Sequence, residues 1–318
     1  MRWFLGILAV LVIVLGGGFY YLSEPDIPRS TLEAKYGTPP SQFVTVPNGA
    51  RIHYRDRGPR DGEILLLLHG SNSSLFTWEP WSKTLSDHFR VISLDLPGHG
   101  LTGAVPNKDY SEKGMVETVN EFADSLHLPQ FALAGNSMGG GVAARYAETY
   151  PSRVSRLILV DAGGMPTKMG DRIPLAFRLA RMSWTRPIML HITPRSLVIE
   201  GLNDAIVRKS IITDKMIDEY WDFARMAGTR EATADRFALA GDWTYIQDHI
   251  SAIKAPTLIL WGEQDHLVPV ASAHAYNKAI PGSKLIVYPA TGHIPMEEVA
   301  SQSAEDVRAF LSNSPTQS

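Results

Sequence analysis

The sequence contains no cysteine among its 318 residues. Disulfide bonds, thiolate nucleophiles and cysteine metal sites are therefore excluded. Long basic runs are also missing, and with a formal net charge of −3 the chain lacks the positive surface that nucleic-acid binding requires. The ten histidines form no His-x-x-x-His pair, and no Gly-x-Gly-x-x-Gly opens a helix after a strand. We expect no metal, no nucleotide cofactor and no nucleic-acid partner.

Charge is absent from the beginning of the chain between Arg2 and Glu24. As a helix, the twenty residues 3–22 would be about 30 Å long, which matches the apolar core of a bilayer. Arg2 precedes the run and acidic residues follow it, which favours an amino terminus in the cytoplasm. The run predicts a transmembrane anchor at 1–23, a polar tether at 24–40, and a single-pass membrane protein with the remaining chain on the periplasmic or extracellular side. Secretion after signal-peptide cleavage is the alternative.

The rest of the chain has the composition of a globular protein, with 44% hydrophobic and 20% charged residues overall. Short apolar runs alternate with helical patterns, which predicts an α/β fold with a mostly parallel central sheet and helices on both faces. Between these parts, Met, Trp, Phe and Arg recur at helical spacing without any run typical of a strand. We therefore expect an α/β core at 41–162 and 251–313, and a helical cap or lid at 163–250.

The most informative motif is Gly135-Asn136-Ser137-Met138-Gly139, a Gly-x-Ser-x-Gly pattern. A buried-strand run precedes it and a helical pattern follows it. A serine on so tight a turn needs glycine on both sides, because neighbouring backbone leaves no room for a Cβ. The motif predicts Ser137 as a nucleophile at a strand–turn–helix elbow; a glycine-rich turn with an incidental serine is the alternative.

A serine hydroxyl is a poor nucleophile at neutral pH, so Ser137 needs a base, and the base needs an orienting carboxylate. Two later predicted strands end in loops that carry such groups, Asp265 in the first loop and His293 in the second. In a parallel sheet, loops at the carboxyl ends of strands lie at one edge, which is where open α/β sheets bind ligands. Asp161, at another strand end, and Glu263 are alternative candidates for the carboxylate.

Together these motifs resemble the α/β-hydrolase superfamily, over roughly 41–162 and 252–313. The resemblance is carried by the pair His69-Gly70, by Asp95-Leu96-Pro97-Gly98-His99-Gly100, by the serine elbow, by Gly262-Glu263-Gln264-Asp265 and by Gly292-His293. It implies that Ser137 is the nucleophile and His293 the general base and acid, and that Asp265 fixes the imidazole tautomer, in the chain order typical of this fold.

The developing oxyanion of such a reaction needs hydrogen-bond donors. The backbone N–H of Met138, at the start of a predicted helix, is the first candidate. The second is the backbone N–H of Ser71, because similar enzymes take this donor from the loop after the His-Gly pair.

The predicted function is hydrolysis of a small-molecule carboxylic ester without a cofactor. Carbon–carbon bond hydrolysis of ring-cleavage products is an alternative, because the sequence from Gly135 to Gly140 is similar to the elbow of those enzymes. Their loop after the His-Gly pair is usually rich in glycine and proline, whereas here it reads Ser71-Asn72-Ser73-Ser74. A non-catalytic binding module on the same fold is a third reading, disfavoured because all three positions of the expected triad hold competent residues.

Overall fold

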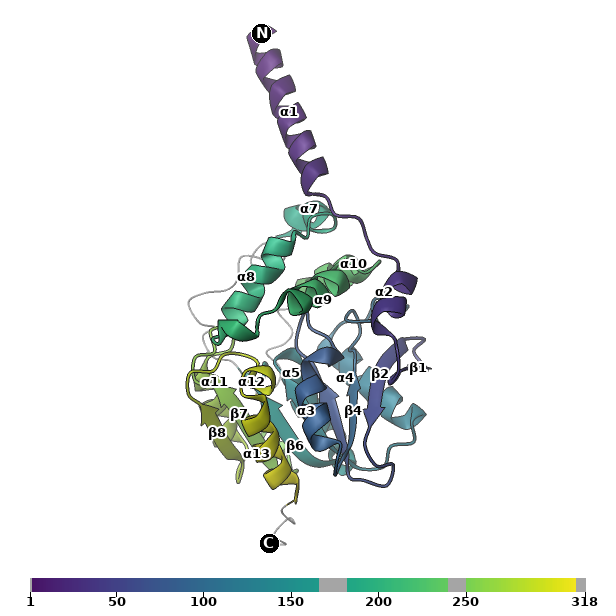
Figure 1. The fold of residues 1–318 in the computed structure, drawn as a ribbon, viewed down its shortest axis with the longest axis vertical. Helices are drawn as coiled ribbons and strands as arrows, with labels where there is room; N and C mark the ends of the chain where they lie inside the picture. The colour runs from purple at the N-terminus through teal and green to yellow at the C-terminus, as the bar shows by residue number, and fades with distance from the viewer. Residues whose placement is uncertain (1, 166–181, 240–249, 313–318) are drawn as a thin grey trace.

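A sheet of eight strands runs through the body of the molecule in the computed structural model, which describes residues 2–165, 182–239 and 250–312 (Figure 1). The strands are β1 (Ser41–Thr45), β2 (Arg51–Arg57), β3 (Ile64–Leu68), β4 (Arg90–Leu94), β5 (Phe131–Asn136), β6 (Val154–Val160), β7 (Thr257–Gly262) and β8 (Lys284–Tyr288). They are arranged in the order β1-β2-β4-β3-β5-β6-β7-β8. β2 is antiparallel to β1 and β4, and all the other pairings are parallel. The predicted mostly parallel sheet is confirmed.

Helices cover both faces of this sheet. They are α3 (Glu79–Leu85), α4 (Glu112–Ser125), α5 (Met138–Thr149), α11 (Val270–Ala279), α12 (Pro295–Glu298) and α13 (Ala300–Ser312). A further helix, α2 (Arg29–Tyr36), packs through Leu32 against Phe223 and Met226 of the insertion. In β3, Leu66 and Leu68 join the core formed with α4, α5 and α11, whereas Leu65 and Leu67 join the core formed with α3 and α13. Successive side chains of a strand point to opposite faces, so a continuous leucine run suits a strand that is buried on both sides.

The strand order places the expected site at one edge of the sheet. From the central strand β3, the chain adds β4 on one side and then β5, β6, β7 and β8 in turn on the other. Because β5 to β8 are parallel, the segments that follow them leave the sheet at the same edge. These segments begin with Ser137, Asp161, the loop of Asp265 and the loop of His293.

The chain between β6 and β7 is helical where the structure describes it. Its helices are α7 (Arg186–Met189), α8 (Arg195–Ala205), α9 (Asp214–Ala224) and α10 (Thr229–Ala238), and residues 182–239 contain no strand. Figure 1 shows these helices as a layer between the sheet and α1 (Arg2–Leu22). The predicted limits of the cap, 163 and 250, lie beside 166–181 and 240–249, outside the described residues, and stay a prediction.

The amino-terminal run forms a helix but not the anchor that we expected. Residues 3–22 lie within α1, which projects from the body (Figure 1). Crossing a bilayer requires about 20 residues of sustained apolar character. Across the ranges that the structure describes, no helix reaches the length and apolar character needed for that. The prediction of a transmembrane anchor at 1–23, and with it the single-pass membrane topology, is therefore wrong.

The segment after α1 is hydrogen-bonded to the insertion. The backbone N–H of Ala227, between α9 and α10, donates to the carbonyl of Ile27 at 3.0 Å. Arg230 of α10 donates from Nη1 to the carbonyl of Glu24 and to Oδ1 of Asp26, both at 2.8 Å. The beginning of the predicted tether is thus docked on α9 and α10, and α2 follows it.

Candidate active site

Ser137 occupies the sharp turn between β5 and α5. Its backbone has φ 52° and ψ −119°, a conformation that a residue with a side chain rarely adopts. A Cβ at Gly135 would lie 2.1 Å from the carbonyl oxygen of Gly139, and a Cβ at Gly139 would lie 2.4 Å from that of His69. Close backbone packing therefore requires both glycines, and Ser137 is left partly exposed at the apex. The predicted strand–turn–helix elbow is present.

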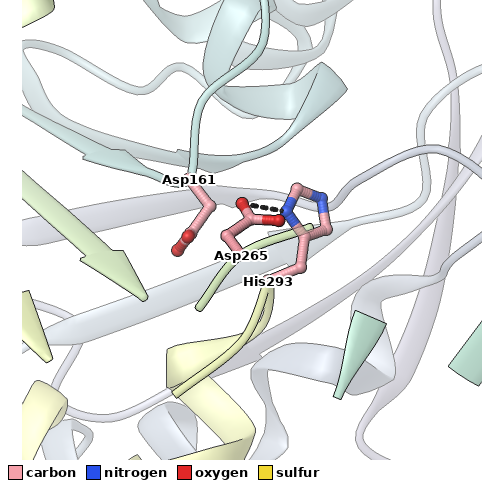
Figure 2. A group of neighbouring side chains, drawn as sticks. All are labelled: Asp161, Asp265 and His293. Atoms are coloured by element: carbon pink, nitrogen blue, oxygen red, sulfur yellow. Dashed lines mark hydrogen bonds and ion pairs between the residues drawn. The ribbon is translucent and has the colours of Figure 1, made fainter. Parts of the chain in front are cut away.

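His293 and Asp265 form a buried hydrogen-bonded pair. Nδ1 of His293 lies 2.7 Å from Oδ2 of Asp265, as Figure 2 shows. A carboxylate only accepts hydrogen bonds, so Nδ1 of His293 is the donor in this bond. Oδ1 of Asp265 accepts from the backbone N–H groups of Leu267 and Val268, at 2.8 and 3.0 Å. Asp265 is therefore fixed by three hydrogen bonds, one of which joins it to the imidazole.

The residue before Ser137 connects the elbow to this pair. The side-chain amide of Asn136 donates from Nδ2 to the backbone carbonyl of His293 at 3.0 Å, and to that of Val160 at 3.2 Å. The backbone N–H of His293 in turn donates to the carbonyl of Ala205 at the end of α8, at 2.7 Å. The structure thus brings Ser137, Asp265 and His293 to the same edge of the sheet, next to the insertion.

Asp161, the alternative acid, lies beside Asp265 but is not bonded to His293 (Figure 2). Its Oδ1 accepts from the backbone N–H of Gly262 at 2.9 Å. Burial and then the neighbouring charge of Asp265 raise the pKa of Asp161 well above its usual value. Glu263, the other alternative, is exposed. The geometry therefore favours Asp265 as the orienting carboxylate.

Ligand atoms of Asp161, Asp265 and His293 lie within 4.8 Å of one another, close enough to share a metal ion. Both oxygens of Asp265 already accept hydrogen bonds, however, and Nδ1 of His293 is engaged by one of them. Metal ligation would have to replace these bonds. The contacts of the group are those of a carboxylate that orients an imidazole.

The two candidate oxyanion donors lie on either side of the elbow. Met138 is the first residue of α5, so its backbone N–H has no acceptor within the helix. Ser71 follows Gly70, where an added Cβ would lie 3.1 Å from Cβ of Ser137. The loop is held by His69, whose Nδ1 lies 2.7 Å from the carbonyl oxygen of Gly70. In the described parts of the chain, neither candidate N–H has a hydrogen-bond acceptor.

Two residues of the insertion reach this loop, and sequence reasoning missed both. Arg236 of α10 donates to the side chains of Ser71 and Asn72, and the hydroxyl of Tyr220 in α9 lies 3.1 Å from Oγ of Ser73. One signal was available for Arg236, since it stands next to Phe237 on a helix whose apolar positions predict burial. Burial of a guanidinium suggests a specific partner, but the partner is far away in the sequence.

A pair of carboxyl groups from α9 and α12 lies near the same loop. Burial, and then the charge of Glu297, raise the pKa of Glu219 to about 8. Burial raises the pKa of Glu297 to about 7, although its Oε1 accepts a hydrogen bond from Thr77 at 2.6 Å. These two groups therefore change charge near neutral pH rather than near pH 4.5.

Comparison with known proteins identifies the family. Residues 63–299 match the family model described as the alpha/beta hydrolase fold, which is most of the chain. The chain belongs to this family. The resemblance inferred from the motifs is thus confirmed, and the protein is an α/β-fold hydrolase.

The relatives of this α/β hydrolase carry names that point to different activities. An uncharacterized protein of Mycobacterium tuberculosis is 30% identical over 285 residues, which cover 86% of this chain and 81% of that protein. The 2-hydroxy-6-oxo-6-phenylhexa-2,4-dienoate hydrolase of Burkholderia cepacia is 28% identical over 290 residues, 86% of this chain and 96% of that enzyme. A solved membrane phospholipase A, described as a bacterial virulence factor, is 26% identical with a TM-score of 0.74, covering 98% of both chains.

Proposed function

We propose that this α/β hydrolase cleaves carboxylic esters through an acyl-enzyme, with Ser137 as nucleophile, His293 as base and acid, and Asp265 as the orienting carboxylate. The observation that carries the proposal is the 2.7 Å bond between His293 and Asp265, at the sheet edge where the elbow presents Ser137. A serine, an oriented imidazole and a carboxylate are the parts that nucleophilic acyl transfer needs.

In the proposed reaction, a neutral His293 acts as the base through Nε2. Ser137 Oγ attacks the ester carbonyl carbon while Nε2 of His293 takes the hydroxyl proton, and the carbonyl oxygen becomes an oxyanion. The bond to the leaving alcohol then breaks, and the imidazolium returns the proton to that alcohol. Water attacks the acyl-enzyme with the same assistance and releases the acid and free Ser137. Asp265 stabilises the imidazolium in both halves.

The backbone N–H groups of Met138 and Ser71 are proposed to bind the oxyanion. Both are free of other acceptors in the described residues and flank Ser137. Donors fixed by the fold are already oriented before charge develops, and removal of one such donor typically costs about 10²- to 10³-fold in kcat.

The helical insertion is proposed to be the cap of the site, with limits near 163 and 250. Its support is the set of contacts from α8, α9 and α10 to the loops of His293 and Ser71. A cap in this position excludes water and contributes the walls of the acyl or alcohol pocket.

Carbon–carbon bond hydrolysis is the second candidate. The 28% identical Burkholderia cepacia enzyme has a name of that class. The loop of Ser71, however, lacks the glycine- and proline-rich character usual in that class. The likeness to a phospholipase A, which by definition cleaves a carboxylic ester, favours the ester reaction.

Turnover of short p-nitrophenyl esters and of a vinylogous diketone acid tests the proposal. We expect ester hydrolysis by the wild type, loss of it in Ser137→Ala, and full activity in Ser301→Ala, which changes an exposed serine on α13. Full ester activity in Ser137→Ala would refute the assignment. Cleavage of the diketone acid faster than of any ester would favour the carbon–carbon reaction.

A further inference from the structure

Arg236 is a buried arginine that joins the proposed cap to both oxyanion donors. Its side chain is 5% exposed. Nη1 donates to Oγ of Ser71 and lies 3.7 Å from Sδ of Met138, while Nη2 donates to Oδ1 of Asn72 at 2.7 Å. One guanidinium from α10 thus contacts the side chains of the two residues whose backbone N–H groups flank Ser137.

This guanidinium has no carboxylate partner among the residues that the structure describes. Arg230 on the same helix is equally buried, at 6% exposed, but pairs with Asp26 at 2.8 Å. Burial lowers the pKa of Arg236 to about 10, so it still carries its charge at pH 7. The pKa of His99 is lowered well below its usual value, first by burial and then by the positive charge of Arg236. No carboxylate in the described residues neutralises this charge, so a negative charge that forms near Ser71 and Met138 would be attracted to it.

We propose that Arg236 is a positioning residue that fixes the loop of Ser71, and that its positive charge, placed behind the oxyanion hole, favours formation of the oxyanion of the reaction. The inference rests on the proposed ester-hydrolase function. The ground-state ester is neutral, whereas its carbonyl oxygen becomes negative in the transition state. An interaction realised only in the transition state raises kcat rather than lowering KM.

An anionic group carried by the substrate is the competing occupant. The contacts of Nη1 disfavour it, because the two hydrogens of this nitrogen are directed to Ser71 and Met138. The guanidinium therefore contacts the side chains of the two residues that carry the donors. The two occupants differ in a measurable way, since a substrate subsite changes KM for charged esters, and a charge behind the oxyanion changes kcat for neutral ones.

The test compares Arg236→Lys, Arg236→Gln and Arg236→Met on a neutral p-nitrophenyl ester and on one with a carboxylate in its acyl chain. For Arg236→Met we expect kcat to fall about 10- to 100-fold on both esters, with KM within about threefold of wild type. Lysine keeps the charge and glutamine keeps only hydrogen bonding, so Arg236→Lys should retain more kcat than Arg236→Gln. Arg230→Met, the same change at the other buried arginine of α10, is the matched control and should keep kcat near wild type.

Circular dichroism and melting temperature show which variants fold. If Arg236→Met does not fold, the inference is tested by whether kcat is higher in Arg236→Lys than in Arg236→Gln. Four results would overturn the inference. They are a wild-type kcat in Arg236→Met, an equal fall in kcat in Arg236→Lys and Arg236→Gln, a fall in kcat in Arg230→Met equal to that in Arg236→Met, and an effect confined to KM for the charged ester. A wild type without Ser137-dependent turnover would overturn the proposed function and this inference together, whereas the other outcomes leave the proposed function intact.

Discussion

Asp161 and Asp265 lie side by side at the edge of the sheet, yet only Asp265 is bonded to His293. Burial and the charge of Asp265 raise the pKa of Asp161 far above its usual value. Two neighbouring buried carboxyl groups do not both ionise readily, so one holds a proton while the other is charged. Asp161 is therefore the carboxyl group that resists ionisation, and Asp265 is the one bonded to the imidazole.

Asp265→Asn should lower kcat for ester hydrolysis by about 10³- to 10⁴-fold, because an amide that donates to Nδ1 favours the wrong imidazole tautomer. Steady-state kinetics on a p-nitrophenyl ester measure this. The fold should persist, since the amide oxygen can still accept from Leu267 and Val268. A loss smaller than about tenfold would show that Asp265 does not orient the base.

Asp161→Asn should change kcat by less than about tenfold, because an amide and a protonated carboxyl group are both neutral. The pH dependence of stability gives a second readout. With its folded pKa raised, Asp161 contributes stability that is fully present below its unfolded pKa of 3.8 and is lost as the pH rises through the folded pKa. Urea unfolding measured from pH 4 to 9 should therefore show that the free energy of unfolding of Asp161→Asn increases relative to that of the wild type as the pH rises. A difference in the free energy of unfolding between the two proteins that stays constant with pH would contradict the raised pKa of Asp161.

Asp161→Ala is the contrasting variant. It removes the acceptor of the buried N–H of Gly262, which should cost about 1 to 3 kcal/mol in the free energy of unfolding.

Glu219→Gln should make the protein less sensitive to alkaline conditions. The wild-type carboxyl contributes stability fully present below its ordinary pKa of 4.5 and lost as the pH rises through about 8. The free energy of unfolding should thus fall between pH 5 and pH 9 by more in the wild type than in the variant, with a difference above about 1 kcal/mol. Glu200→Gln, at an exposed position of α8, should behave as the wild type. Parallel pH profiles for all three proteins would contradict the raised pKa.

Gly139→Ala should lower the free energy of unfolding by about 3 kcal/mol or more, because its Cβ would lie 2.4 Å from the carbonyl oxygens of Leu68 and His69. Gly201→Ala is the matched change inside α8, where nothing lies within 4 Å of the added Cβ. It should stabilise the protein by about 0.5 to 1 kcal/mol. Chemical unfolding of both variants measures the contrast, and equal effects would show that the elbow does not require glycine.

The sheet and the elbow were predictable because local patterns determine them. The leucine run of β3 and the apolar run of β6 form strands where the alternation of strands and helices predicted them. Glycine spacing identified the turn of Ser137, and the steric reason is local for Gly135, whose added Cβ would meet the backbone of Gly139. Asp265 and His293 meet because parallel strands end at one edge, so topology alone brings them together.

Other features depend on contacts that no local pattern encodes. Arg236 meets Ser71 across 165 positions of the chain, and the raised pKa of Glu219 depends on burial and on the charge of Glu297 from another helix. The docking of Glu24 and Asp26 on Arg230 also joins residues far apart in the sequence, and nothing in the local pattern of the polar tether at 24–40 predicts it. For α1, the uncharged run correctly predicted a helix, but the prediction that this helix spans a membrane was wrong.

Labelling with a fluorophosphonate probe tests the central claim most directly, because the probe reacts with a serine only when an oriented base activates it. We expect the folded wild type to be labelled at Ser137, as shown by mass spectrometry of the modified peptide, and Ser137→Ala to remain unlabelled. His293→Ala should also lose labelling, while Ser301→Ala should keep it. No labelling of folded wild type, or labelling that survives Ser137→Ala, would contradict the account and leave a binding module on a hydrolase fold as the better description.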